Sequence, residues 1–220
     1  MDIRLDVKDS EVNAVLALPP GGSGPGILLL HAWWGLNPYF KELCEQIAAQ
    51  GFVCLAPDLF QGETAKTREE AEDLVNRRDD DEYIGSVVTA AKDHLLAHPA
   101  CTSEKVGVVG FSFGAAWVLV AASKRPEQVG AGVLFYGIWR ADFESIQAPF
   151  LGHFSDVDEW EPYDNTVKLI DEMDEIGLDV EFHTYPGQPH WFMESDRPEY
   201  DAEAAKLAWD RTFTFLKENL

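Results

Sequence analysis

Apolar residues along the chain form two alternating patterns, short continuous runs and longer stretches with a helical period. The short runs are rich in Val, Ile and Leu and are typical of strands buried on both faces of a sheet. They cover residues 26–31, 52–56, 106–109, 131–136, 150–154 and 180–185. Stretches with apolar positions three or four residues apart predict helices. They cover residues 39–50, 67–75, 81–98, 163–176 and 201–218, and an Ala-rich apolar helix follows residue 114. Residues 2–7 and 12–18 alternate as in a hairpin.

Strands and helices alternate from residue 26 onward, and this order predicts the fold class. It favours a doubly wound α/β fold with a mostly parallel sheet of about seven or eight strands and helices on both faces. Residues 1–220 contain no repeat and no linker, so we expect one domain. No uncharged apolar stretch reaches the roughly 18 residues of a membrane span. Residues 1–12 are charged throughout, and we expect no signal peptide there.

The charge of the chain excludes two classes of partner. Lys and Arg together number 17 against 39 Asp and Glu, a formal net charge of −22. Such a field repels nucleic acids and anionic membranes, so neither is an expected partner. Two explanations fit the excess of carboxylates. One is adaptation to high salt, where repulsion between charges is screened, and the other is an ordinary acidic protein of a mesophile. The three cysteines are widely spaced, without metal-site spacing, which predicts no metal and a reduced, cytoplasmic protein.

A G-x-S-x-G motif at residues 110–114 supplies the first candidate for chemistry. It lies between a strand-like run and a helix-like run, the setting in which a sharp turn projects a serine hydroxyl away from the sheet. The flanking glycines leave room for strand and helix to approach each other closely. We therefore predict Ser112 as a nucleophile. The backbone N–H of Phe113, at the start of the helix, is an expected donor to an oxyanion.

A serine nucleophile needs a histidine base, which in this fold follows the serine along the chain. Three histidines follow residue 112. His153 and His183 fall inside predicted strands, where histidines more often pack or bond locally. His190 lies in a Pro/Gly-rich loop after the last predicted strand. We predict His190 as the base.

The acid that orients the histidine should follow the strand at residues 150–154. Asp156 and Asp158 both qualify, with Glu159 and Glu161 as weaker candidates. Periodicity does not choose between the two aspartates, and charged loop residues are more often merely solvated.

Several motifs together resemble the dienelactone hydrolase family. They are residues 31–37 (HAWWGLN), 110–114 (GFSFG), 135–137 (FYG), 158–162 (DEWEP), 185–192 (YPGQPHWF) and the Ala/Trp-rich helix at 204–216. The resemblance implies an α/β-hydrolase fold and cofactor-free hydrolysis of small esters or lactones. The family's acid lies four residues before a proline, which points to Asp158. Its second oxyanion donor is a backbone N–H that corresponds to Trp33.

Three positions depart from the family's type members. Ser112 stands where they have cysteine, and Ala32 stands where they have a glutamate that serves the thiol. Glu194 stands where they have an arginine that holds the substrate's carboxylate. A glutamate would repel that group, although Arg77 or Arg78 could still reach the pocket. These departures favour a neutral small ester over dienelactone itself.

Aromatic residues in the motif loops are candidates for the substrate pocket, with core packing as the alternative for each. The candidates are Trp33, Trp34, Tyr136, Trp139 and Trp191, with Arg78 as a polar member. A peptidase, thioesterase or perhydrolase would use the same triad, so these activities remain alternatives. A binding protein that has lost catalysis is the non-enzymatic alternative. We expect a monomer or a small homo-oligomer.

Overall fold

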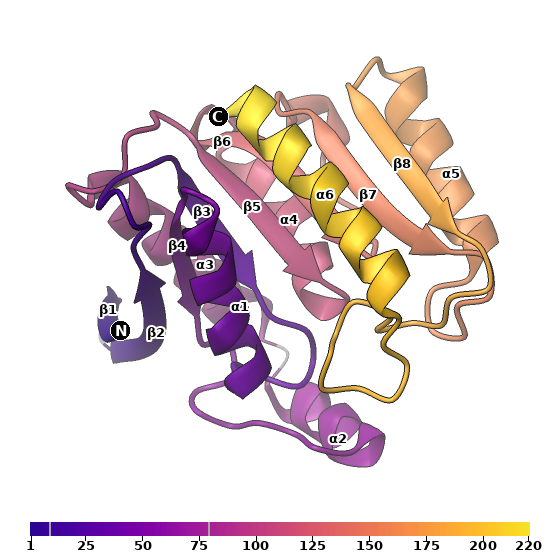
Figure 1. Ribbon diagram of the computed structural model, residues 1–220, viewed down its shortest axis with the longest axis horizontal. Coiled ribbons are helices and arrows are strands. Elements are labelled where there is room, and N and C mark those ends of the chain that lie inside the picture. The colour runs from indigo at the N-terminus through magenta and orange to yellow at the C-terminus, as the bar shows by residue number, and fades with distance from the viewer. Residues whose placement is uncertain (9, 79) are drawn as a thin grey trace.

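Eight strands form one sheet through the centre of the molecule, in a computed structural model that describes residues 1–8, 10–78 and 80–220 (Figure 1). Their order is β1-β2-β4-β3-β5-β6-β7-β8. The hairpin partners β1 and β2 are antiparallel, as are β2 and β4, and all other neighbours are parallel. The mostly parallel α/β sheet predicted from the sequence is thereby confirmed.

The strands are β1 (Asp2–Val7), β2 (Ser10–Ala17), β3 (Gly26–Leu30), β4 (Val53–Pro57), β5 (Val106–Phe111), β6 (Val129–Phe135), β7 (Phe150–Ser155) and β8 (Val180–Tyr185). The helices are α1 (Pro38–Ala49), α2 (Arg68–Arg78), α3 (Asp81–Ala97), α4 (Phe113–Lys124), α5 (Tyr163–Glu175) and α6 (Ala202–Asn219), with short 3₁₀ turns at Pro126–Gln128 and Phe143–Ser145.

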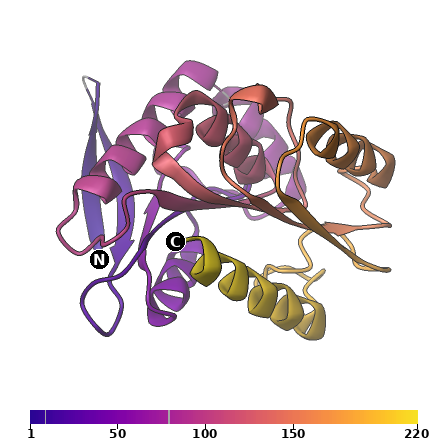
Figure 2. The ribbon, with the colours of Figure 1, turned by 90° about the horizontal axis from the view of Figure 1, so that it is seen from above.

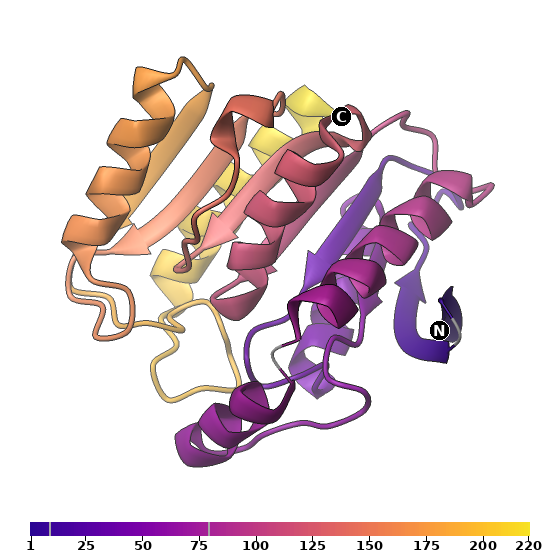
Figure 3. The ribbon, with the colours of Figure 1, turned by 180° about the vertical axis from the view of Figure 1, so that it is seen from behind.

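Helices cover both faces of the sheet (Figure 2). Helices α1 and α6 lie on one face, and α3, α4 and α5 lie on the other. Figure 3 shows α2 apart from these layers, at the edge where the parallel strands end. Among the helices of the described residues, none is both long enough and apolar enough to cross a membrane.

The burial of the central strands explains why their sequences are continuous apolar runs. Every residue of β3, β4 and β5 is buried, because helices cover both faces. Helix α2 runs three residues beyond its predicted end at residue 75. Its last turn is held by Arg77, which pairs with Asp73 within the helix and with Glu63 in the preceding loop.

The strand order places a crevice at the carboxyl ends of β3 and β5. The chain passes from β3 to β4 on one side and then returns to β5 on the other side of β3. The connections that follow β3 and β5 therefore diverge, and ligands bind in the crevice that such a divergence leaves. The loops that follow β3, β5, β7 and β8 all emerge at this edge.

Candidate active site

Ser112 occupies a strained turn between β5 and α4. Its backbone has φ 49° and ψ −111°, in the left-handed region that L-residues rarely adopt. The Ser112 N–H donates to the carbonyl of Phe135 on the neighbouring strand at 2.8 Å, and the Ser112 carbonyl accepts from the Ala115 N–H at 2.9 Å. Both sides of the strained residue are therefore fixed by hydrogen bonds.

Two glycines permit this turn by leaving space for backbone. A Cβ atom on Gly114 would collide with the carbonyl oxygens of Leu30 and His31 at the end of β3. A Cβ atom on Gly137, which follows β6, would collide with the Ser112 carbonyl. Gly114 belongs to the G-x-S-x-G motif, whereas Gly137 comes from a different strand and supports the same residue.

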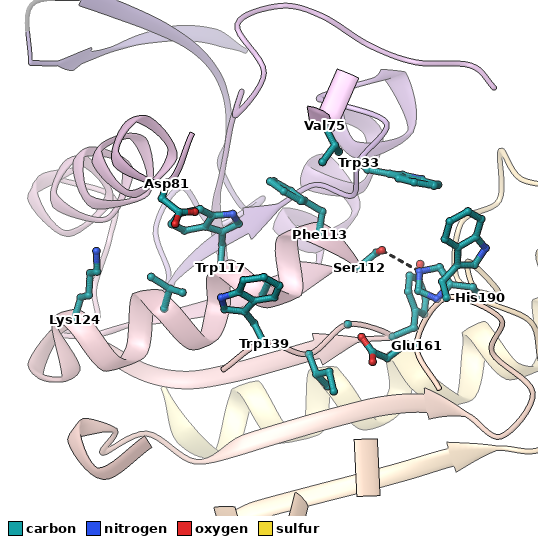
Figure 4. A pocket seen from close by; sticks show the side chains of 16 residues that line it. Trp33, Val75, Asp81, Ser112, Phe113, Trp117, Lys124, Trp139, Glu161 and His190 are labelled. Carbon is teal, nitrogen blue, oxygen red and sulfur yellow. Dashed lines mark hydrogen bonds between the residues drawn. The ribbon is translucent and has the colours of Figure 1, made fainter. Parts of the chain in front are cut away.

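Ser112, His190 and Asp158 form a continuous hydrogen-bonded chain. The His190 Nε2 atom lies 2.9 Å from Ser112 Oγ, and His190 Nδ1 lies 2.6 Å from Asp158 Oδ2 (Figure 4 shows the first contact as a dashed line). The His190 and Asp158 side chains are 4% and 2% exposed, so water does not compete for these bonds. Because the carboxylate only accepts, Nδ1 carries the proton and Nε2 is free to accept from the serine hydroxyl.

Asp158, rather than Asp156, contacts the histidine. The other oxygen of Asp158 accepts from the N–H groups of Trp160 and Glu161, at 2.8 and 2.9 Å, which fixes the carboxylate's orientation. Asp156 instead accepts from the Gly187 N–H at 2.7 Å and ties down the loop before His190.

The two other candidate histidines lie outside the site. His153 is buried and bonded to the Tyr185 hydroxyl and to Thr212 Oγ1. Its burial lowers its pKa well below the usual range. His183 contacts Glu181 on the outer strand β8.

The two residues whose backbone N–H groups are the expected oxyanion donors lie on two different elements next to the cavity. Phe113 is the first residue of α4, so its N–H has no acceptor within the helix. Trp33, in the loop after β3, lines the same cavity as Ser112. The buried His31 holds that loop, because its Nε2 accepts from the Leu59 N–H at 3.0 Å and its Nδ1–H donates to the Ala32 carbonyl at 2.7 Å. The sequence motif contained His31 but did not reveal this structural role.

A cavity of about 430 Å³ opens beside Ser112 and His190 (Figure 4). Its wall is mostly apolar and aromatic. Of the predicted pocket residues, Trp33, Tyr136 and Trp139 line this cavity. The residues that the sequence did not indicate include Trp117, Val120, Lys124, Ile138 and Trp160.

Three predicted pocket residues lie elsewhere. Trp34 and Trp191 are 1% exposed and pack behind the cavity wall, where the ring centroid of Trp191 lies 5.7 Å from that of Trp33. Arg78 is bound to Glu63 and to Gln61, so its guanidinium group is occupied away from the cavity. Arg77 also pairs with Glu63.

The charged groups that line the cavity are mainly acidic. Glu161 lines the cavity together with Ser112 and His190, and burial raises the pKa of its carboxyl group to about 7. Asp81 and Lys124 lie at the far end, as Figure 4 shows. Lys124 is the sole Lys or Arg among the described residues that form the wall. From the sequence, Glu161 was expected only as a weaker candidate for the acid that orients the histidine, and nothing in its spacing indicated a cavity position.

Glu194 does not face the cavity, contrary to its expected repulsion of substrate. It is fully buried, and its Oε1 accepts from the Tyr136 hydroxyl at 2.7 Å. Burial raises its pKa to about 8. The Tyr136 ring lies 4.7 Å from the His190 ring, so Glu194 supports the site from behind. The expectation failed because sequence position did not reveal which way this loop residue points.

The described residues contain no group of His, Cys, Asp or Glu side chains that could hold a metal ion.

Comparisons with known proteins connect this geometry to a family. The sequence model of the dienelactone hydrolase family matches residues 12–220. The chain is 33% identical over 230 residues to Protein usf of Aquifex pyrophilus, covering 99% of this chain and 98% of that protein. It is 30% identical over 214 residues to a candidate carboxymethylenebutenolidase of Aquifex aeolicus (strain VF5), covering 91% of each. Among solved structures, a dienelactone hydrolase-like promiscuous phosphotriesterase from metagenomic libraries superposes with a TM-score of 0.88 at 23% identity, covering 100% of this chain and 97% of that one.

The family match and the structural match both extend over nearly the whole chain. The strained turn at Ser112 lies within the matched region. We conclude that the chain belongs to the dienelactone hydrolase family and is a hydrolase of the type that acts on esters or lactones.

Proposed function

We propose that the protein hydrolyses small carboxylic esters or lactones through a covalent acyl-enzyme on Ser112. The observation that carries the proposal is the hydrogen-bonded chain from Ser112 Oγ through His190 to Asp158. It supplies a nucleophile, a base within reach, and a carboxylate that fixes the tautomer of the base.

The reaction has two halves. His190 Nε2 takes the proton from the Ser112 hydroxyl as Oγ attacks the substrate carbonyl carbon. The protonated imidazole then gives that proton to the leaving alkoxide as the C–O bond breaks. Water attacks the acyl-enzyme in the second half, again with His190 as the base, and the acid and the free serine are released.

Two backbone N–H groups, those of Phe113 and Trp33, bind the oxyanion in both halves. The Phe113 N–H is at the positive end of α4, which adds the helix dipole to the hydrogen bond. A donor of this kind lowers the barrier by about 3 kcal/mol in comparable enzymes.

The wall of the cavity supports a neutral substrate. It is largely aromatic and aliphatic. The charged group of the wall that lies on the Ser112 and His190 side is the Glu161 carboxyl, which would repel an anion once ionised. Among the wall residues that the structure describes, the one Lys or Arg is Lys124, which lies at the far end of the cavity from Ser112. These features favour an uncharged ester or lactone over dienelactone, whose carboxylate would need a cation.

Hydrolysis of p-nitrophenyl acetate tests the proposal. We expect Ser112→Ala to lower kcat/KM at least about 10³-fold and Asp158→Asn to lower it by about 10³–10⁴-fold. The matched control is Asp156→Asn, because Asp156 also lies after β7 but contacts Gly187 instead of His190. We expect that variant to stay within about threefold of wild type.

A wild-type enzyme without turnover and without an acyl-enzyme burst would overturn the proposal. Equal losses in Asp156→Asn and Asp158→Asn would remove the role assigned to Asp158. The same assay with thioester and amide substrates ranks thioesterase and peptidase activity against ester hydrolysis.

A further inference from the structure

The cavity extends far beyond the space that an acetyl group needs, and its extension follows one face of α4. Ala116, Trp117 and Val120 line it from that helix, at positions one and two turns after Ser112. Ile138 and Trp139 line it from the loop after β6. The result is an apolar groove, defined by these five residues, that begins at the nucleophile.

The groove lies on the opposite side of Ser112 from His190. In Figure 4, His190 is on one side of Ser112, whereas Trp117 and Trp139 lie on the other and lead to Asp81 and Lys124. His190 must hand its proton to the leaving alcohol, so the alcohol part of an ester has to lie on the His190 side. The acyl part then points away from His190 and into the groove.

We propose that this groove is an acyl-chain subsite for unbranched, uncharged acyl groups of up to about eight carbons. Val120 is eight residues beyond Ser112, which is about 12 Å along the helix axis. An extended eight-carbon acyl chain attached to the Ser112 side chain spans roughly this distance. The proposal rests on the ester hydrolysis proposed above and names the class of acyl group that it serves.

The far end of the groove sets the length limit. Asp81 and Lys124 line it, and Lys124 is exposed, so the chain meets charged groups and water there. Methylenes beyond this point gain nothing from burial. Along the way Trp139, which is 61% exposed in the free protein, would lose apolar surface to a bound chain.

Two series of esters, compared by their kcat/KM values, distinguish the binding of the acyl part from the binding of the alcohol part. In p-nitrophenyl esters of increasing acyl length, we expect about a two- to fourfold rise per methylene and a plateau near eight carbons. In alkyl acetates, where only the alcohol lengthens, we expect a much weaker trend. A flat acyl series would overturn the subsite while leaving the esterase intact.

Val120→Phe fills the distal groove and is the decisive variant. We expect the octanoate-to-acetate ratio of kcat/KM to fall at least about tenfold, and the octyl-to-methyl ratio in alkyl acetates to stay as in wild type. Ala116→Leu blocks the groove closer to Ser112 and should shift the optimum to still shorter acyl chains. The control is Leu207→Phe, which adds the same ring at an exposed position of α6 on the opposite face of the sheet. Loss of the alkyl trend instead of the acyl trend in Val120→Phe would reverse the assignment.

A binding measurement keeps the subsite testable apart from catalysis. Calorimetric titration of Ser112→Ala with octanamide and acetamide probes an uncharged acyl group without turnover. We expect octanamide to bind more tightly and Val120→Phe to remove the difference. Equal affinity for the two amides would reject the subsite, whatever the outcome for hydrolysis.

Discussion

Two carboxyl groups next to the triad have raised pKa values, but they have different surroundings. Glu161 faces the cavity, so its charge affects what enters. Glu194 is enclosed behind Tyr136, so its charge affects the stability of the folded protein. Asp196 and Glu199 raise the Glu194 pKa further, whereas Arg197 and the Tyr136 hydrogen bond lower it. Burial is the largest of these causes.

Replacement of Glu194 by Gln tests this effect on stability. The pKa of Glu194 is raised from 4.5 to about 8 on folding, so between these values the folded protein holds a proton that the unfolded chain releases. The free energy of unfolding should therefore fall as pH rises through this window. Glu194→Gln should unfold like wild type at about pH 5 and be more stable than wild type at about pH 9, by on the order of a few kcal/mol.

Urea unfolding at several pH values measures this difference. Glu45→Gln is the matched control, because Glu45 is exposed on α1. Parallel stability curves for wild type and Glu194→Gln would show that Glu194 does not titrate in this window.

At the residue scale, the sequence was most informative where chemistry constrains it. The serine follows from its motif, and the chain order directs attention to His190. The family resemblance singled out Asp158, which the structure then places against His190. The aromatic wall was harder to predict, because Trp117 and Trp191 read alike as apolar residues. One lines the cavity and the other packs behind it, since tertiary packing decides which way each ring points.

At the element scale, the strand–turn–helix unit of β5 and α4 depends on a strand that is distant in sequence. The Ser112 N–H bonds to Phe135 at the end of β6, and Gly137 follows two residues later against the Ser112 carbonyl. The same helix then provides one wall of the apolar groove. The position of Ser112 and one wall of the cavity are therefore set by one pair of neighbouring strands.

Gly137→Ala should disturb this unit without removing any functional group. The added methyl group collides with backbone, and overpacking of this kind costs about 1–3 kcal/mol. A shift of Ser112, the proposed nucleophile, should also lower kcat by about 10²-fold. Thermal unfolding and steady-state kinetics measure the two effects.

Gly21→Ala is the control for this change, because a methyl group there meets open space. It should leave both quantities close to wild type. A Gly137→Ala enzyme with wild-type kcat would show that the turn does not depend on this close approach.

The elements themselves were largely readable from the sequence. Strands buried on both faces leave continuous apolar runs, and β3, β4 and β5 are buried throughout. The last three residues of α2 were not predicted, because they are polar and continue no apolar pattern, and the ion pair of Arg77 with Glu63 forms only in the fold. The contact of Gly137 with Ser112 was likewise hidden, since the sheet order sets it.

At the scale of the whole molecule, the net charge of −22 opposes compactness. The exposed ion pairs of the described residues, such as those of Arg4 with Glu11 and Lys206 with Asp210, each contribute at most about 1 kcal/mol. They leave most carboxylates without a partner, because acidic residues outnumber basic ones by more than two to one. Repulsion between these carboxylates should outweigh the pairs.

Stability should therefore rise with salt. Between about 0.1 M and about 1 M NaCl the screening length falls from about 10 Å to about 3 Å, which weakens repulsion across the surface. We expect the Tm to increase over this range, measured at constant pH by calorimetry. A falling Tm would mean that the ion pairs matter more than the net charge.

The tryptophans around the cavity have an optical consequence. Trp33 lies within 4.9–5.7 Å, between ring centroids, of Trp34, Trp160 and Trp191. Indoles at this spacing transfer excitation energy to one another. Light absorbed by one ring can therefore be emitted as fluorescence by another ring of the cluster. Because Trp33 and Trp160 also line the cavity, a ligand that displaces water there would alter the emission and the near-ultraviolet circular dichroism of the group. The protein thus carries an intrinsic reporter of occupancy, and no label is needed to follow binding in real time.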